Sequence, residues 1–243
     1  GAGTKVMPIA FLDNLIRGAR PPLAADSMPL SHRFRSLPHG ALKVWQQPQP
    51  GETYVVGIDP AEGLAHGHLS GAVVRRWRDW AHCASLLGHL DPHTFAGVLV
   101  ELGRAYNDAL LSWERKFHSW ALQERIVSQL HYPRVYRYLG IGGIPGDGRE
   151  GFPTSGPGKA ELIKALVASM DEGRWHSWDV ELLRQCRELE ETGERAGYMM
   201  YDTGTKDLLM ADLMCLIGRE QGRPPRAART EAGVDAVPAW ERR

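Results

Sequence analysis

The segment TYVVGIDPAEG, residues 53–63, carries a short apolar run that ends in an acidic residue. The run is mainly β-branched, aromatic or small, and a Pro-Gly pair precedes it, so the segment predicts a buried β-strand. Asp59 follows this strand directly. Catalytic and ligand-binding groups of open α/β sheets gather where strands end, which makes Asp59 a candidate metal ligand. The alternative is that Asp59 and Pro60 only start a turn, where both residue types are common.

The hydrophobic pattern outside this strand predicts one mixed α/β domain. Two further strands follow closely, at residues 71–77 and 81–90, and the short connection between them favours an antiparallel meander. Beyond residue 90, predicted helices alternate with strands, an order that is typical of parallel pairing. The expected helices are 91–107, 119–130, 159–170, 180–189 and 206–218, and the expected strands are 109–114 and 135–138.

The flanking segments differ in composition from this domain. Residues 1–43 are polar and Pro-containing apart from one short amphipathic stretch, and we interpret them as an arm or linker packed on the domain. The domain itself is expected over residues 44–220. Residues 221–243 begin with a run rich in Pro and Arg and are expected to form a disordered tail. Within the domain, the Gly-rich stretch 140–158 is expected to be a mobile loop.

The composition narrows the classes of function. The 243 residues include 29 Lys and Arg and 29 Asp and Glu, so the zero net charge does not by itself indicate a nucleic-acid partner. The three cysteines are scattered without a CxxC pair, which indicates neither a disulfide framework nor a zinc site. No apolar run approaches the roughly 18–20 residues of a membrane span. We therefore expect a soluble intracellular protein.

Two further acids extend the candidate site. The apolar run ALLSW, residues 109–113, brings Glu114 to a strand end in the same way as Asp59. Asp207 opens the last predicted helix, where the helix dipole stabilises an anion. Two-metal phosphodiester chemistry needs acidic ligands that converge from different elements, so Asp59, Glu114 and Asp207 form a candidate metal site. For each acid taken alone, a solvated strand end or a helix cap is the alternative.

Other charged residues are secondary candidates. Asp212 lies about 140° around the predicted helix from Asp207, so we interpret it either as a buried partner of an arginine or as a secondary site residue. Basic residues near the acids are candidate contacts for DNA phosphates, with a solvated surface as the alternative. These candidates are Arg75, Arg76, Arg115, Lys116 and Lys159.

In combination, these segments resemble the nuclease domain of phage terminase large subunits. The resemblance begins with GALKVW, residues 40–45, and PGETYVVGIDPAEG, residues 50–63, and runs to about residue 218. It continues in order through the strand that ends in an acid, the next strand, a Thr-containing loop with its helix, and the start of the last helix. These segments are LSWER at 111–115, LHYPRVY at 130–136, GFPTS at 151–155, KAELI at 159–163 and KDLLMA at 206–211.

The resemblance implies a ribonuclease H-like fold, in which an antiparallel meander and parallel strands form a mixed sheet flanked by helices. It also implies a metal-dependent endonuclease that cuts double-stranded DNA with one or two Mg²⁺ or Mn²⁺ ions held by Asp59, Glu114 and Asp207. The stretch GPGK, residues 156–159, lacks the spacing of a P-loop and the Ser or Thr after its lysine. We therefore expect no ATPase half of a terminase in this chain, which is either an isolated domain or a fragment of a longer motor protein.

The same resemblance implies partners and a location. The expected partners are double-stranded DNA, the portal protein, the small terminase subunit and the ATPase domain of the full-length protein. The expected location is the packaging motor in the host cell cytoplasm, not a membrane and not the mature virion.

Two positions depart from the family pattern. His68 stands where the family usually carries an Asp shortly before a Ser, and Lys206 replaces the first of two adjacent aspartates. Both are secondary site candidates, and they predict a preference for Mn²⁺ over Mg²⁺ because histidine nitrogen suits Mn²⁺ better. They also support one alternative, a non-catalytic DNA-binding or assembly module on a decayed nuclease fold. A Holliday-junction-resolvase-like nuclease is the alternative within the same fold.

Overall fold

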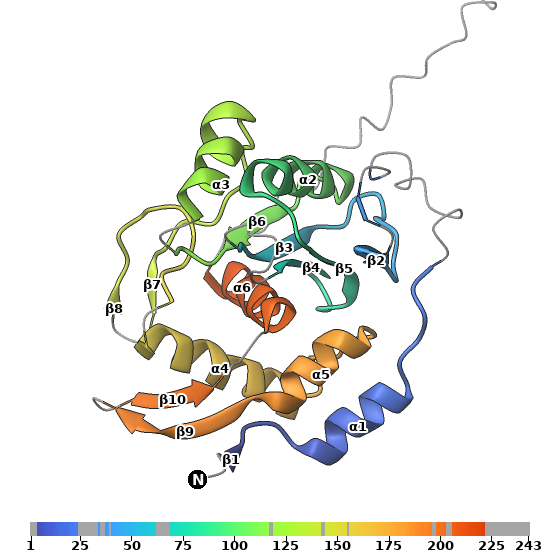
Figure 1. The fold of residues 1–243 in the computed structure, drawn as a ribbon, viewed down its shortest axis with the longest axis vertical. Helices are drawn as coiled ribbons and strands as arrows, with labels where there is room; N and C mark the ends of the chain where they lie inside the picture. The colour runs from blue at the N-terminus through green and yellow to red at the C-terminus, as the bar shows by residue number, and fades with distance from the viewer. Residues whose placement is uncertain are drawn as a thin grey trace, which may run out of the picture.

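A central five-stranded sheet dominates the computed structural model, which describes residues 4–23, 34, 37–38, 40–61, 69–116, 119–141, 144–154, 156–195, 198–202 and 206–221. The strand order is β2-β5-β4-β3-β6 (Figure 1). The strands are β2 (Leu42–Val44), β3 (Tyr54–Asp59), β4 (Ser70–Arg76), β5 (His82–Gly88) and β6 (Leu110–Trp113).

The pairing within this sheet is mixed. β2, β5, β4 and β3 pair antiparallel in that order, whereas β3 pairs parallel with β6. The crossover from β5 to β6 runs through α2 (Pro92–Ala105), whose first turn is capped by the Asp91 side chain. The predicted meander and the predicted parallel strand are therefore confirmed, and the fold class is ribonuclease H-like.

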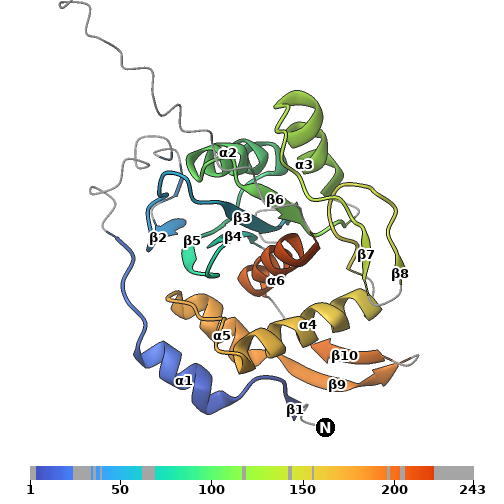
Figure 2. The ribbon, with the colours of Figure 1, turned by 180° about the vertical axis from the view of Figure 1, so that it is seen from behind.

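Helices cover both faces of the sheet, and the alternation of side chains along β3 explains why every residue of this strand is buried. Val55 packs in the cluster that includes α6 (Asp207–Gln221), while Val56 packs in the cluster that includes α2. The two helices lie on opposite sides of the sheet (Figures 1 and 2). A Cβ atom at Gly57 would lie 1.9 Å from the Ala211 carbonyl oxygen, so the close approach of α6 to β3 requires glycine there.

A second layer packs on the outer side of α6. Two helices, α4 (Gly156–Asp171) and α5 (Val180–Glu188), contact α6, and α1 (Ile9–Arg17) contacts α5 (Figure 1). A small antiparallel sheet lies beside α4 and has the order β1-β9-β10. Its strands are β1 (Thr4–Lys5), β9 (Glu190–Arg195) and β10 (Tyr198–Asp202).

Two predicted elements differ in the structure. Residues 135–138 are not a regular strand: Val135 and Arg137 form only isolated bridges, to Leu111 and to residues 150–151. The chain leaves the sheet edge after one bridge, so the ladder does not continue. The predicted helix 119–130 is α3 (Trp120–Glu124) followed by one π-helical turn, η4 (Arg125–Gln129).

The Gly-rich stretch is more regular than its composition suggests. It contains the short pair β7 (Gly140–Ile141) and β8 (Ile144–Pro145), and α4 already begins at Gly156. The predicted tail beyond Gln221 and the candidate residue His68 lie outside the described residues. Within the described ranges, no helix is both long and apolar enough to cross a membrane.

Candidate active site

Asp59 and Glu114 meet at the ends of two neighbouring strands. β3 and β6 run parallel with Ile58 opposite Trp113, so the acid that follows each of these residues lies at the same sheet edge. The Glu114 amide donates a hydrogen bond of 3.0 Å to the Ile58 carbonyl, which holds the two chains together at this point. Both acids are almost inaccessible, with exposed fractions of 5% for Asp59 and 3% for Glu114. Parallel pairing thus brings together two acids that are far apart in sequence.

One lysine bridges the two acids. Lys116 Nζ lies 2.9 Å from Asp59 Oδ1 and also contacts Glu114 Oε2. The Thr154 hydroxyl, in the segment before α4, donates a hydrogen bond to the other oxygen, Glu114 Oε1. Sequence reasoning missed both of these roles. The available signal was the spacing of Lys116 two residues after Glu114, since side chains two positions apart in extended chain point to the same side.

Negative charge exceeds positive charge in this group. Burial raises the pKa of Asp59 well above its ordinary value, and the neighbouring Glu114 raises it further. Burial also opposes ionisation of Glu114, but its hydrogen bond with Asp59 and the charge of Lys116 outweigh burial and lower the pKa of Glu114. Burial likewise opposes the charge on Lys116, whereas the two carboxylates raise its pKa above the ordinary value. Glu114 therefore ionises before Asp59, and added positive charge favours ionisation of both.

Asp207 lies at the start of α6, against the strand that pairs with β3. It occupies the first turn of α6, as predicted. Gly71 of β4 pairs with Asp59 in the β3–β4 ladder, and a Cβ atom on Gly71 would lie 2.7 Å from the Asp207 carbonyl oxygen and 3.3 Å from its Cβ. Asp207 and the adjacent Lys206 are each 5% exposed. The start of α6 therefore sits against the strand position opposite Asp59, which needs glycine because the approach is so close.

The chemistry of the donors fits a hard divalent cation. Within the described part of the chain, no three His, Cys, Asp or Glu side chains already form a group able to hold a metal ion. The two contacting acids nevertheless offer carboxylate oxygens in a buried position, and a cationic ammonium already lies between them. Mg²⁺ and Mn²⁺ prefer oxygen ligands of this kind.

Solved structures resemble this chain over most of its length, although no protein-family model and no curated protein matches it. The large terminase nuclease from thermophilic phage G20c with bound magnesium has a TM-score of 0.63 at 18% identity, covering 89% of this chain and 98% of that chain. The large terminase nuclease domain of Thermus phage P74-26 has a TM-score of 0.57 at 18% identity, covering 75% of this chain and 87% of that chain.

The chain has the fold of large terminase nucleases. The resemblance drawn from the sequence is thereby confirmed for the fold. The G20c nuclease has also been solved with bound cobalt and with bound zinc.

The candidate DNA contacts in this terminase-like fold occupy different environments. Arg76 pairs with Asp79 at the turn after β4, and Arg115 pairs with Asp147. Lys116 faces the two acids, and Lys159 is half-buried in α4. Each of these four stays a prediction as a DNA contact.

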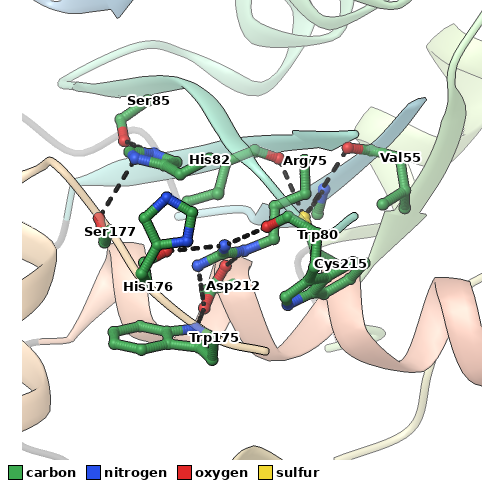
Figure 3. A network of polar contacts seen from close by, with 12 residues as sticks. Val55, Arg75, Trp80, His82, Ser85, Trp175, His176, Ser177, Asp212 and Cys215 are labelled. Carbon is green, nitrogen blue, oxygen red and sulfur yellow. Dashed lines mark hydrogen bonds and ion pairs between the residues drawn. The ribbon is translucent and has the colours of Figure 1, made fainter. Parts of the chain in front are cut away.

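Arg75 does not fit a DNA-binding role. Its side chain is completely buried and forms two hydrogen bonds with Asp212 of α6. The remaining donors reach the carbonyl oxygens of Trp80 and His176, at 2.9 and 3.0 Å. Figure 3 shows the Arg75 guanidinium enclosed by these groups. The prediction for Arg75 was wrong because β4 is an interior strand whose α6 face is covered, which a local basic run does not reveal.

The same network defines the role of Asp212. Its second oxygen accepts a hydrogen bond of 2.6 Å from Trp175 Nε1, in addition to the bond from Arg75 (Figure 3). Of the two interpretations of Asp212, the structure supports the buried partner of an arginine. Nearby, His82 lies between the hydroxyls of Ser85 and Ser177 at 3.0 and 3.2 Å.

Proposed function

We propose that this chain is the nuclease domain of a phage terminase large subunit and cuts double-stranded DNA with Mg²⁺ or Mn²⁺. The single observation that carries the proposal is the meeting of Asp59 and Glu114 at adjacent strand ends, buried and short of positive charge. The terminase nuclease fold supports it, because a ribonuclease H-like sheet presents such strand ends to a substrate.

Asp59, Glu114 and Asp207 are the proposed metal ligands. Bound divalent ions would supply an activated water and stabilisation of the leaving 3′ oxygen. The chain's own residues prepare this chemistry. Thr154 holds one oxygen of Glu114 and so orients the carboxylate, while burial keeps water from screening the charges of the site. Asp207 contributes its carboxylate from the start of α6, where the helix dipole favours its ionised form.

The proposal extends to the setting of a packaging motor in the host cytoplasm. Partners would be double-stranded DNA, the portal protein, the small terminase subunit and the ATPase domain of a longer chain. Phosphate contacts by Arg76, Arg115, Lys116 and Lys159 would position the duplex without reading its sequence.

Nicking of supercoiled plasmid with Mn²⁺, with Mg²⁺ and with EDTA tests the proposal. Asp59→Asn and Glu114→Gln should each lower the rate by at least about 100-fold, since each removes ligand charge from the transition-state clamp. Asp91→Asn is a matched control, because Asp91 is an exposed helix cap and Asn caps equally well. Cleavage that persists in EDTA or in Asp59→Asn would contradict the metal-ligand roles.

A second substrate separates the terminase proposal from a resolvase. A four-way DNA junction and a linear duplex of equal length are compared at equal concentration. A terminase nuclease should cut both at similar rates, whereas a preference of tenfold or more for the junction would favour the resolvase. Absence of cleavage on every substrate, together with intact DNA binding, would favour the non-catalytic module.

A further inference from the structure

Lys116 has a partly exposed side chain whose ammonium nevertheless contacts two buried acids. Its ammonium contacts Asp59 and Glu114 at the same time, and both acids are almost completely buried. These contacts use Asp59 Oδ1 and Glu114 Oε2, one oxygen from each strand end. The ammonium therefore takes up the charge and the donor atoms that the proposed metal site would use.

The Lys116 backbone is fixed, although its side chain is not enclosed. The Lys116 amide donates a hydrogen bond of 3.0 Å to Ser119 Oγ, and the Lys116 carbonyl accepts one of 2.7 Å from the same hydroxyl. The preceding residue is held as well, because the Arg115 amide donates to the Phe152 carbonyl at 2.8 Å. The Lys116 side chain is 35% exposed, so it has a path to solvent that requires no backbone movement.

We propose that Lys116 is the resident counter-ion of the metal-free site and that divalent metal must displace its ammonium to bind. This inference rests on the proposed function, since it assigns the metal to Asp59 and Glu114. The physical argument is exchange of cations. Two adjacent buried carboxylates are costly without positive charge, and an ammonium and a divalent ion that share the same oxygens repel each other strongly at low dielectric.

The exchange has two consequences for the protein. Without metal, Lys116 stabilises the folded domain because it compensates the carboxylate pair. With metal, the same contacts must be broken, so Lys116 weakens metal binding and makes occupancy depend on the metal concentration. The intact site would therefore be occupied only when the ion is plentiful or when bound DNA adds ligands of its own.

The test measures Mn²⁺ binding by isothermal titration calorimetry and the Tm with and without Mn²⁺, independently of nuclease activity. Lys116→Met keeps the aliphatic stem but removes the charge, and we expect about tenfold tighter Mn²⁺ binding, which is about 1.4 kcal/mol and comparable to one hydrogen bond to a charged group. In EDTA its Tm should fall by about 5 °C, and saturating Mn²⁺ should remove that difference.

Two variants control for charge and for general effects of removing a lysine. Lys116→Arg retains a cation that can bridge both acids. The Kd of this variant for Mn²⁺ and its Tm should therefore stay close to those of the parent protein. Lys164→Met removes a lysine of α4 that is 63% exposed and pairs with Glu161, so neither quantity should change measurably.

The outcomes separate this inference from the proposed function. If Asp59→Asn abolishes Mn²⁺ binding but Lys116→Met binds Mn²⁺ no more tightly than the parent, the metal site stands and the displacement idea is wrong. Unchanged metal affinity in Lys116→Met combined with weaker DNA binding would also overturn it and identify a phosphate contact. If the parent protein shows no Asp59-dependent Mn²⁺ binding, the proposed function fails and the inference falls with it.

Discussion

Two groups of buried charge lie along α6, and they are built in opposite ways. Towards the middle of the helix, Asp212 faces a single arginine, Arg75, and the guanidinium is also satisfied by two carbonyl oxygens (Figure 3). At its first turn, Asp207 packs against Gly71, which pairs with Asp59 in the β3–β4 ladder. Lys116 bridges Asp59 and Glu114 at the neighbouring strand ends.

The difference separates a structural group from the proposed metal site. The Arg75–Asp212 group is balanced in charge and enclosed by the rings of Trp80 and Trp175, with the guanidinium carbon 5.4 Å from each ring centre. The two charges of this pair compensate each other, and both side chains are almost completely buried. The Asp59–Glu114 group holds two acids against one lysine, and burial, followed by the charge of Glu114, raises the pKa of Asp59. Unbalanced buried charge is costly to folding and persists where a ligand uses it.

Breaking the balanced group should have the largest effect on stability. Asp212→Asn leaves the Arg75 charge buried without a counter-ion, and we expect a loss of about 3–5 kcal/mol in the free energy of unfolding. Urea denaturation followed by circular dichroism measures it. The matched control is Asp79→Asn, which breaks the exposed pair with Arg76 and should cost about 1 kcal/mol or less. Equal losses in the two variants would contradict the distinction between the groups.

Gly57 tests the close packing of the helix that carries both groups. In Gly57→Ala the new Cβ would lie 1.9 Å from the Ala211 carbonyl oxygen and 2.4 Å from the Cys215 amide nitrogen, so α6 must move. We expect a loss of about 2–3 kcal/mol in the free energy of unfolding. Gly97→Ala, with no atom within 4 Å of its Cβ, should instead leave stability unchanged or raise it by up to about 1 kcal/mol. Similar results for both variants would show that α6 tolerates the displacement.

The free energy of unfolding should also depend on pH through His82, which lies near the Arg75–Asp212 pair. Burial, and then the charge of Arg75, lower the pKa of His82 well below 6.5. The folded protein therefore binds this proton less readily than the unfolded chain, so the stability contribution is complete above pH 6.5 and is lost as the pH falls below it. The slope should reach up to about 1.4 kcal/mol per pH unit.

Unfolding by urea between pH 7 and pH 5 measures this slope. His82→Gln should reduce it, and a remainder is expected from His176, whose pKa is lowered for the same reasons. If the parent protein and His82→Gln show the same slope, His82 does not carry the pH dependence.

The smallest expected effect is at the unbalanced group, and its sign is opposite to that of Asp212→Asn. Burial makes the ionised form of Asp59 costly in the folded protein. Asp59→Asn places a permanently neutral side chain there, so in EDTA the free energy of unfolding should rise by up to about 1 kcal/mol. Thermal unfolding in EDTA provides the measurement. A loss of more than about 2 kcal/mol would mean that Asp59 has a structural role and that the nicking result needs another explanation.

Local patterns in the sequence were sufficient to predict most of the helices and strands of the central domain. The apolar run before Asp59 predicted β3, and Asp91 with its following proline predicted the start of α2. Residues 135–138 were predicted wrongly as a strand, because an extended apolar segment has the same local pattern whether or not a neighbouring chain continues the ladder.

For the candidate site, too, local sequence patterns predicted some features and missed others. Strand ends and the helix start pointed to Asp59, Glu114 and Asp207, because the residue types at those positions are visible in one dimension. The failure of Arg75 as a DNA contact, and its pairing with Asp212, depend on which face of β4 the last helix covers.

The sequence by itself determined most of the strands and helices of the central domain and the acids at their ends, since these follow from periodicity and residue type over a few neighbouring positions. Only the tertiary structure decided which charges meet. The parallel register of β3 and β6 brought Asp59 to Glu114, and the spacing of two residues after Glu114 then let Lys116 reach both. Coulomb energies depend on distance and burial, and both quantities are set by contacts between segments that are far apart in the chain.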